Sequence, residues 1–270
     1  MRVAVLGLGE AGSLLAADLA RGGDEVHGYD PARPPGIDGV QRHETDPAAV
    51  TGCTLVMAAT SGSQASVVLE QVAPHLQEGA IYADLSTGSP SLKHQLSEVA
   101  AGAGASFADV ALMSAVPGRG LSTPALASGS GAVDYARLIN ARGGNVEVVG
   151  QKAGEAAARK LLRSVVMKGL AALLIESTEA AARYGQADWF WSHLVDQLGS
   201  IDEVWMERLL FATTSHVGRR LEEMEAAREL LGELGVPATM TGAVIDQFRR
   251  LLEHGMPDVR PSPDSGPRSG

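Results

Sequence analysis

Three residues in the second half of the chain combine reactive side chains with helical spacing. Lys160, Ser164 and Lys168 recur at every fourth position, so they share one side of a predicted helix. A buried lysine has a lowered pKa and can exchange a proton with a substrate oxygen. A surface lysine stripe is the usual explanation, but the neighbouring residues are apolar and leave little of the helix for solvent: Leu161, Leu162, Val165 and Val166. We therefore expect at least one of the two lysines to enter a cavity.

Two loops rich in hydroxyl groups follow predicted strands. Ser86 and Thr87 come after the strand 81–84, so we expect them to project into a crevice where hydroxyls can hold a carboxylate. The alternative is that this Ser/Thr/Gly/Pro segment only caps a helix from Ser91. Thr60 and Ser61, after the strand 55–59, either cap the next helix or touch a cofactor.

A glycine pattern stands near the start of the chain. G-x-G-x-x-G follows the apolar run 3–6, leads into a helix-like stretch 13–21, and consists of Gly7, Leu8, Gly9, Glu10, Ala11 and Gly12. Gly7 permits a tight turn, Gly9 lets the backbone approach a pyrophosphate, and Gly12 allows close helix packing. The unpaired N–H groups of the helix's first turn then face the phosphates. Because the third glycine opens the helix, a dinucleotide site is favoured over a methyltransferase-type loop.

An acid at the end of the second predicted strand bears on which dinucleotide binds. Asp30 lies 18 residues after Gly12, close to the spacing of about 20 in dinucleotide fingerprints. Its carboxylate can accept hydrogen bonds from the adenine ribose and would repel a 2′-phosphate, so NAD is the first choice. Arg33 could instead meet a phosphate, which keeps NADP as an alternative.

Composition excludes several classes of function. Among 270 residues, 22 basic and 32 acidic side chains give a net charge of −10, which argues against a general nucleic-acid or anionic-membrane role. The single Cys53 cannot form an intrachain disulfide and is expected in or near the core. The histidines make no metal-binding pair, so no metal is expected. With no targeting segment before Val3 and no membrane span, we expect a cytoplasmic protein.

The two halves of the chain have different patterns. Up to residue 150, short apolar runs alternate with helix-like stretches such as 64–73 and 91–102, and the runs are 3–6, 25–29, 55–59, 81–84, 106–110, 125–128 and 146–149. This alternation predicts a doubly wound α/β domain with a mainly parallel sheet over residues 1–150. Ligands of such sheets bind beyond the carboxyl ends of the strands.

After residue 150 the strand signal disappears. We expect an all-helical domain over 151–256, opened by a long helix 154–183 that lies between two lobes, and a disordered tail over 257–270. Asp188 is expected to cap a helix 189–198, and Ser200 with Glu203 to form a capping box for the next. Further helices are expected at 216–234 and 238–253. The domain's tryptophans are interpreted as packing residues, with a partner surface as the second interpretation: Trp189, Trp191 and Trp205.

The order of these parts resembles the β-hydroxyacid dehydrogenase superfamily, which contains 3-hydroxyisobutyrate and 6-phosphogluconate dehydrogenases. The resemblance rests on the N-terminal glycine pattern, the D-x-S-T loop at 84–87, and the glycine-to-lysine segment 154–160 that opens the long helix. It implies a Rossmann domain followed by a helical domain that often dimerises. It also implies that Lys160 transfers the proton, with Ser86 and Thr87 near the substrate, and it gives Lys168 the weaker claim to that role.

The chain also departs from that family. Where the hydroxyacid dehydrogenases carry S-G-G after the sixth strand, this chain reads Met113 and Ser114 within the segment 112–117, and Ser164 replaces the asparagine that usually follows the lysine. The chain looks more like a branch with a 6-phosphogluconate-dehydrogenase-like NAD-binding domain and a C-terminal domain of unknown function. His216 and Arg219 could clamp an anionic substrate, or Arg219 and Glu223 could be a surface pair.

These patterns support one leading function and two alternatives. We expect an NAD(P)-dependent oxidoreductase that passes hydride between nicotinamide and a small, anionic hydroxy or keto acid, with Lys160 as proton donor or acceptor. The first alternative is a C=N (imine) reductase of similar architecture, which the apolar Met113 and Val116 favour. The second is a sensor that binds NAD(P) without turnover. The resemblance implies a homodimer through the C-terminal helices.

Overall fold

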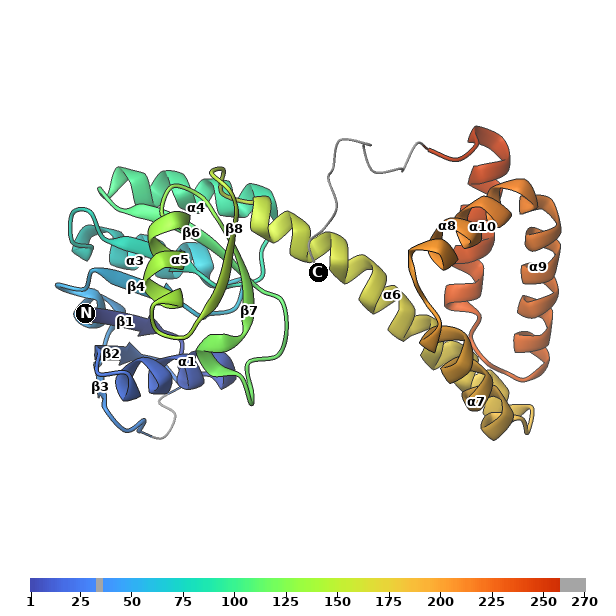
Figure 1. Ribbon diagram of the computed structural model, residues 1–270, viewed down its shortest axis with the longest axis horizontal. Helices are drawn as coiled ribbons and strands as arrows, with labels where there is room; N and C mark the ends of the chain where they lie inside the picture. The colour runs from blue at the N-terminus through green and yellow to red at the C-terminus, as the bar shows by residue number, and fades with distance from the viewer. Residues whose placement is uncertain (33–35, 258–270) are drawn as a thin grey trace. The chain divides into compact units, whose positions relative to one another are not determined.

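The computed structural model describes residues 1–32 and 36–257 and forms two compact units, Met1–Val165 and Val166–Gly270 (Figure 1). The division falls inside helix α6 (Glu155–Arg183), whereas the sequence pattern places the end of the first domain at residue 150. The tail expected at 257–270 lies, apart from Pro257, outside the described residues. Among the described helices, none combines the length and the apolar character needed to cross a membrane.

The first unit is built on one eight-stranded sheet with the order β3-β2-β1-β4-β5-β6-β7-β8. Every neighbouring pair is parallel except β6 with β7. The order of the first six strands is that of dinucleotide-binding Rossmann folds. The strands are β1 (Arg2–Leu6), β2 (Glu25–Tyr29), β3 (Val40–Arg42), β4 (Leu55–Ala58), β5 (Ile81–Asp84), β6 (Ser106–Leu112), β7 (Pro124–Ser128) and β8 (Asn145–Gly150).

Helices cover both faces of this sheet (Figure 1). They are α1 (Glu10–Arg21), α2 (Asp46–Val50), α3 (Ala65–Val72), α4 (Pro90–Gly102) and α5 (Ala132–Asn140), with short 3-10 turns η1 (Ala73–His75) and η2 (Gly120–Ser122). One apolar cluster joins the sheet to α1 and α5, and the other joins it to α2, α3 and α4. All residues of β4 and β5 are buried because both faces of the sheet are covered, which explains why these strands are apolar up to Asp84.

The expected Rossmann class and all seven expected strands are confirmed, with strand ends within two residues of the prediction. The sequence pattern does not predict β3, α2 or α5. Cys53 is fully buried, as expected, and its thiol contacts the Ala49 carbonyl oxygen at 3.4 Å. Burial raises the pKa of that thiol to about 11, so it is not a ready nucleophile.

The described part of the second unit consists of helices and the segments that connect them. It contains α6 from Val166 onward, α7 (Ala187–Gly199), α8 (Glu203–Ser215), α9 (Val217–Glu233) and α10 (Thr239–His254). Its small buried cluster consists of Ala180, Leu231 and Val236. Polar contacts reinforce this core: the Glu176 carboxylate accepts backbone N–H groups at the start of α10, and Arg183 donates to carbonyls after α9.

Two expectations about helix capping are wrong. Asp188 lies inside α7, whose preceding residue Gln186 makes no side-chain cap. Helix α8 is capped by Asp202, which accepts the N–H of Trp205 at 2.7 Å, and not by Ser200. Asp202 directly precedes the helix and is as good a capping residue as serine, so which of the two residues caps the helix depends on where the chain turns.

The expectation that apolar side chains leave little of α6 for solvent is also wrong for this chain. Leu162, Val165 and Val166 are 70%, 72% and 67% exposed. Trp189 and Trp191 are each 62% exposed, so they do not pack inside the helical unit, while Trp205 is half-buried.

Candidate functional site

The glycine loop between β1 and α1 has the geometry that its sequence predicts. Gly7 has φ +86°, and a Cβ there would lie 2.8 Å from the Ala59 carbonyl oxygen. A Cβ on Gly12 would lie 1.9 Å from the Gly7 carbonyl oxygen, so only glycine lets α1 start this close to the loop. A Cβ on Gly9 meets nothing within 4 Å, which leaves open space in front of the exposed backbone there.

The start of α1 is free to bind an anion. Gly9 is the N-cap residue and supplies no side-chain cap, so the first N–H groups of the helix are not satisfied by a side chain. Within the loop Leu8 is buried, Ala11 half-buried and Glu10 exposed. Ala11 can therefore serve a pyrophosphate only through its backbone N–H, because its side chain has no polar atom.

Asp30 faces the glycine loop and also holds it in place through a hydrogen bond. Its Oδ2 accepts the N–H of Leu8 at 2.7 Å and its Oδ1 accepts the N–H of Ala32 at 2.8 Å. Each carboxylate oxygen keeps a further lone pair for a ribose hydroxyl. Arg33, the residue expected to accept a 2′-phosphate, lies outside the described residues.

A groove of about 440 Å³ runs along these elements. Its lining includes the loop glycines, the end of β2, the start of α2 and one face of α3: Gly7, Gly9, Tyr29, Asp30, Pro31, Asp46, Ala59, Thr60, Ser61, Gln64, Val67, Val68 and Gln71. The volume lies within the usual range for small-ligand sites, and the lining pairs apolar surface with a few polar groups. These residues fit the adenosine and pyrophosphate part of a dinucleotide.

Asp46 is a groove residue that the sequence pattern does not single out. It is the first residue of α2 and its side chain is mostly buried. Burial, with the negative charge of Asp30 adding to it, raises the pKa of Asp46 to about 6. Two carboxylates therefore line the part of the groove where an adenine ribose would lie.

Thr60 and Ser61 line the groove, as the cofactor alternative for their loop predicts. The capping alternative is wrong, because Gln64 precedes α3 and makes no side-chain cap. In contrast, the loop after β5 does cap a helix: Ser89 accepts the N–H of Leu92 at 3.2 Å, and α4 begins at Pro90.

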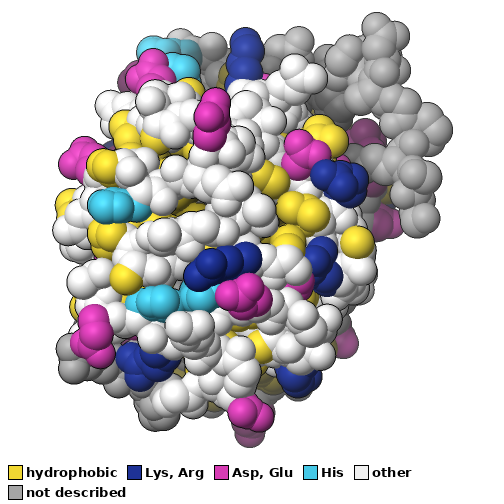
Figure 2. Space-filling model, turned by 90° about the vertical axis from the view of Figure 1, so that its left-hand side faces the viewer, with side chains coloured by type: hydrophobic (Ala, Val, Ile, Leu, Met, Phe, Trp, Pro, Cys, Tyr) yellow, Lys and Arg dark blue, Asp and Glu magenta, His cyan; other side chains and the backbone are white. Residues whose placement is uncertain are grey.

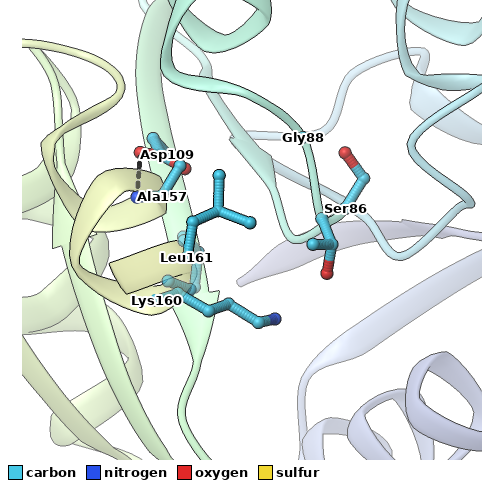
Figure 3. Close-up of a pocket in the computed structure, with 9 residues that line it drawn as sticks. Ser86, Gly88, Asp109, Ala157, Lys160 and Leu161 are labelled. Carbon is cyan, nitrogen blue, oxygen red and sulfur yellow. Dashed lines mark hydrogen bonds between the residues drawn. The ribbon is translucent and has the colours of Figure 1, made fainter. Parts of the chain in front are cut away.

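The loop after β5 also lines a second, narrower pocket, which has no room for a water molecule in this arrangement of the side chains (Figure 3). Its walls come from that loop, from β6 and from the first turns of α6: Ser86, Thr87, Gly88, Asp109, Val110, Ala111, Ala157, Lys160 and Leu161. The Lys160 side chain extends from α6 toward the loop that carries Ser86 and Gly88 (Figure 3). Ser86 is buried and its hydroxyl donates to Asp84 Oδ2 at 2.9 Å, whereas Thr87 is exposed.

The groove and the narrower pocket adjoin. Leu6, Ala58 and Asp84 are in register across β1, β4 and β5, so the loops that follow them leave the same edge of the sheet. A Cβ on Gly62 would lie 2.2 Å from the Thr87 carbonyl oxygen, so the two loops are in direct contact. The glycine loop, the two hydroxyl loops and Lys160 thus lie in one region of the first unit.

A buried charged cluster lies beneath this region and is absent from the sequence-based predictions. Lys93 of α4 is 1% exposed and its Nζ lies 2.6 Å from Asp84 Oδ2 and 3.2 Å from Asp109 Oδ1. Both acids are equally buried. A signal was present: Lys93 shares the buried stripe of α4 with Leu96 and Ala100, and a lone acid stands in the middle of β6.

The other expected site residues lie outside both pockets. Ser164 is half-buried one turn beyond Lys160, and Lys168 is an exposed residue of the second unit. Met113 is half-buried and Ser114 exposed after β6. His216 is exposed just before α9.

Arg219 makes the surface pair that was the alternative to a substrate clamp. Its Nε lies 3.7 Å from Glu223 Oε1, and both side chains are well exposed. Within residues 1–32 and 36–257, His, Cys, Asp and Glu side chains form no group of three that could hold a metal ion.

Each half of the chain matches a known domain family. Residues 2–132 match the NAD binding domain of 6-phosphogluconate dehydrogenase. Residues 181–251 match a domain of unknown function, DUF1932. The glycine groove lies within the first match, which makes the first unit an NAD-binding domain.

Individual relatives are distant. An uncharacterised 28.5 kDa protein from Methanothermus fervidus is 25% identical over 173 residues, which are 64% of this chain and 66%, just under two thirds, of that protein. A conserved protein of unknown function, whose structure is described as similar to 3-hydroxyacid dehydrogenases, is 29% identical with a TM-score of 0.61 and coverage of 94% of this chain and 97% of that one.

A second similar structure shares the fold at lower identity. An imine reductase variant from Myxococcus stipitatus in complex with NAD+ has a TM-score of 0.79 at 18% identity, with 94% of each chain covered. Together with the family matches, this fold likeness agrees with the strand order and with the glycine loop. Residues 2–132 belong to the NAD-binding domain family of 6-phosphogluconate dehydrogenase, and residues 181–251 belong to the domain family DUF1932.

Proposed function

We propose that this chain is an NAD(P)-dependent oxidoreductase that transfers hydride between nicotinamide and a small, anionic hydroxy or keto acid. One observation carries the proposal: the loop contact between Gly62 and Thr87 joins the dinucleotide groove to the pocket that contains Lys160. A dinucleotide whose adenosine half fills the groove has its other half directed toward that pocket. The similarity of a relative to 3-hydroxyacid dehydrogenases supports the substrate class.

Different residues of the chain bind the cofactor, orient the substrate and transfer the proton. A bound NAD(P) supplies or accepts the hydride. Gly9 and the uncapped N–H groups of α1 hold its pyrophosphate, and Asp30 holds the adenine ribose. Lys160 moves a proton between its Nζ and the substrate oxygen, and the exposed Thr87 hydroxyl orients the substrate carboxylate. Ser86 already donates to Asp84, so it can offer substrate only a lone pair.

Substitution of Lys160 tests this assignment. Lys160→Ala should lower kcat by about 100-fold or more, the usual range for loss of a general acid or base, while the Kd for NADH changes little. Lys152→Ala, at an exposed lysine near the start of the same helix, is the matched control and should behave as the unsubstituted protein. If the Lys160→Ala variant keeps its turnover, Lys160 does not transfer the proton, and Lys168 becomes the next residue to test.

A second candidate function is reduction of C=N bonds. The fold likeness to an imine reductase and the apolar, half-buried Met113 beside the buried Val116 favour it. A panel of keto acids and cyclic imines, each with NADH and with NADPH, separates the two reactions by which class consumes cofactor. Tight cofactor binding without turnover on any member of the panel would instead support a nucleotide-sensing role.

We propose NAD as the preferred cofactor. Asp30 and Asp46 both line the groove, and two carboxylates there disfavour the additional charge of a 2′-phosphate. NADP remains the alternative through Arg33. Kd values for NADH and NADPH, measured by fluorescence titration, test the preference directly.

We propose a small-molecule partner, and neither nucleic acid nor a membrane. Figure 2 shows acidic side chains interspersed with basic ones over one face of the described chain, which agrees with the net charge of −10. A phosphate backbone requires clustered Lys and Arg. Binding to duplex DNA or anionic vesicles at low salt would contradict this proposal.

We propose that two copies of the chain pair through the second unit, as the family resemblance implies. Its helices expose large apolar side chains that a single chain leaves in water, among them Ile175, Trp191 and Phe211 at 68%, 62% and 74% exposure. Light scattering after size-exclusion chromatography should give twice the chain mass. Trp191→Glu should shift the mass toward one chain, whereas Glu207→Gln, at an exposed polar position of α8, should not.

A further inference from the structure

The buried Lys93 lies where two parts of the proposed active site meet. Its Nζ donates to the backbone oxygens of Asp84 and Ser86, at 3.1 and 2.8 Å, and to Asp84 Oδ2 at 2.6 Å. These three acceptors belong to the end of β5 and the loop that continues to Thr87 and Gly88. The lysine therefore fixes the path of the loop that lines the pocket.

The second partner of Lys93 controls the helix that carries Lys160. Asp109 Oδ1 makes its only described contact with Lys93 Nζ, at 3.2 Å. The other oxygen, Oδ2, accepts the N–H of Gly154 at 3.1 Å and of Ala157 at 3.0 Å, so Asp109 caps the start of α6. The cap ends one helical turn before Lys160.

A third side chain secures the same cap. Ser128 of β7 donates to Asp109 Oδ2 at 3.2 Å and accepts the N–H of Ala156 at 3.0 Å. The first turn of α6 is thus bonded to β6 and β7, and through Asp109 to Lys93 and the loop after β5. Burial of one ammonium and two carboxylates is costly unless each is compensated. Here the lysine and the helix N–H groups together offset the two negative charges.

We propose that Lys93 is a positioning residue for the reaction proposed above: its ammonium group holds the 86–88 loop and, through Asp109, the Lys160-bearing turn of α6 in one arrangement. This inference rests on the proposed function. Lys93 has no route to substrate, since its side chain is enclosed beneath the loop. Its effect is geometric, and displacement of a reacting group by about 1 Å can cost on the order of 100-fold in rate.

The test compares Lys93→Met with the double variant Lys93→Met/Asp84→Asn, which removes one negative charge with the positive one and protects against simple failure to fold. Lys152→Met is the matched control at an exposed lysine. Below the unfolding temperature of each variant, both Lys93 variants should keep the NADH Kd within about 2-fold and lose ~10–100-fold in kcat. The amide protons of Gly154 and Ala157 should exchange at least ~10-fold faster in both.

The outcomes separate the inference from the proposed function. A double variant with the kcat of the unsubstituted protein, or amides at 154 and 157 that exchange at the original rate, would overturn the positioning role. If the unsubstituted protein turns over no member of the keto acid and imine panel, the proposed function fails. In that case hydrogen exchange alone decides whether Lys93 holds the start of α6.

Discussion

Asp30 Oδ2 accepts a hydrogen bond from the backbone N–H of Leu8 at 2.7 Å, which ties the end of β2 to the middle of the glycine loop. The acid expected to select the cofactor thus also holds the loop that binds its phosphates. Leu8 is 2% exposed, so its N–H has no ready access to water if the carboxylate is removed. Charge and hydrogen bonding at Asp30 must therefore be separated experimentally.

Two substitutions make that separation. Asp30→Asn keeps an oxygen for the Leu8 N–H but removes the charge, so we expect near-original stability and a smaller preference for NADH over NADPH. Asp30→Ala also removes the acceptor and should cost about 1–3 kcal/mol in the free energy of unfolding. It should weaken NADH binding more than NADPH binding, as fluorescence titration can measure. A larger loss for NADPH would contradict the NAD assignment.

We expect alanine substitutions at Gly12 and Gly9 to differ in their effects on stability and NADH affinity. A Cβ at Gly12 overlaps the Gly7 carbonyl oxygen, so Gly12→Ala should lower both stability and NADH affinity. A Cβ at Gly9 meets no atom of the protein within 4 Å, so Gly9→Ala should melt within about 2 °C of the original protein yet bind NADH at least ~10-fold more weakly. Unchanged affinity in Gly9→Ala would mean that no pyrophosphate passes over this residue.

Most of the Rossmann domain could be predicted from the sequence because its strands are short, mainly apolar runs bounded by turn residues. The elements that escaped were short or weakly marked. Strand β3 has three residues and α2 five, too few for a period to show. In α5 the signal was present, since its buried residues recur at helical spacing: Ala132, Tyr135, Ala136 and Ile139.

The site residues also fall into those that could be predicted from the sequence and those that could not. Gly7, Gly9 and Asp30 could be placed from local spacing, because one strand–helix–strand unit, β1–α1–β2, brings all three to its carboxyl end. The contact between Lys93 and Asp109 could not, because it depends on how α4 packs against β6. Asp46 is likewise brought beside Asp30 only by the pairing of β2 with β3.

Asp46 predicts an unusual dependence of stability on pH. Burial and the Asp30 charge raise its pKa from 3.8 to about 6, so folding favours the protonated acid. This stabilisation is fully present below about pH 4 and is lost as pH rises through about 6. Asp46→Asn should therefore be about 1–2 kcal/mol more stable than the original protein at pH 8 and gain little at pH 4, as urea unfolding at the two pH values can show.

The same substitution bears on cofactor choice. Without the Asp46 charge, the groove keeps Asp30 as its remaining described carboxylate, so NADPH should bind several-fold more tightly at pH 8 while NADH changes less. Glu44→Gln, at an exposed acid two residues earlier, controls for the general change in net charge. Equal gains in NADPH affinity from both substitutions would show that Asp46 has no specific effect.

The contacts of Glu176 lead to a prediction about the stability of the second unit. It is 8% exposed, and its carboxylate accepts the N–H groups of Met240 and Thr241 and the Thr241 hydroxyl, at 2.7, 2.9 and 2.6 Å. Glu176, a residue of α6, thus caps the N-terminus of α10. Glu176→Ala should cost about 1–3 kcal/mol in the free energy of unfolding, the usual range for loss of a cap or of a buried hydrogen-bond partner.

The pH dependence identifies the charged carboxylate as the cap. Although burial opposes ionisation, the hydrogen bonds from Thr241 and Met240 outweigh it and lower the pKa of Glu176 below 4.5. The stabilisation is therefore present above pH 4.5 and lost as pH falls through the lowered pKa. The difference in melting temperature between Glu176→Ala and the original protein should be largest near neutral pH and shrink toward pH 3. Glu179→Ala, at a more exposed acid on the same helix, should show a smaller and less pH-dependent loss, and equal losses from both would contradict the cap.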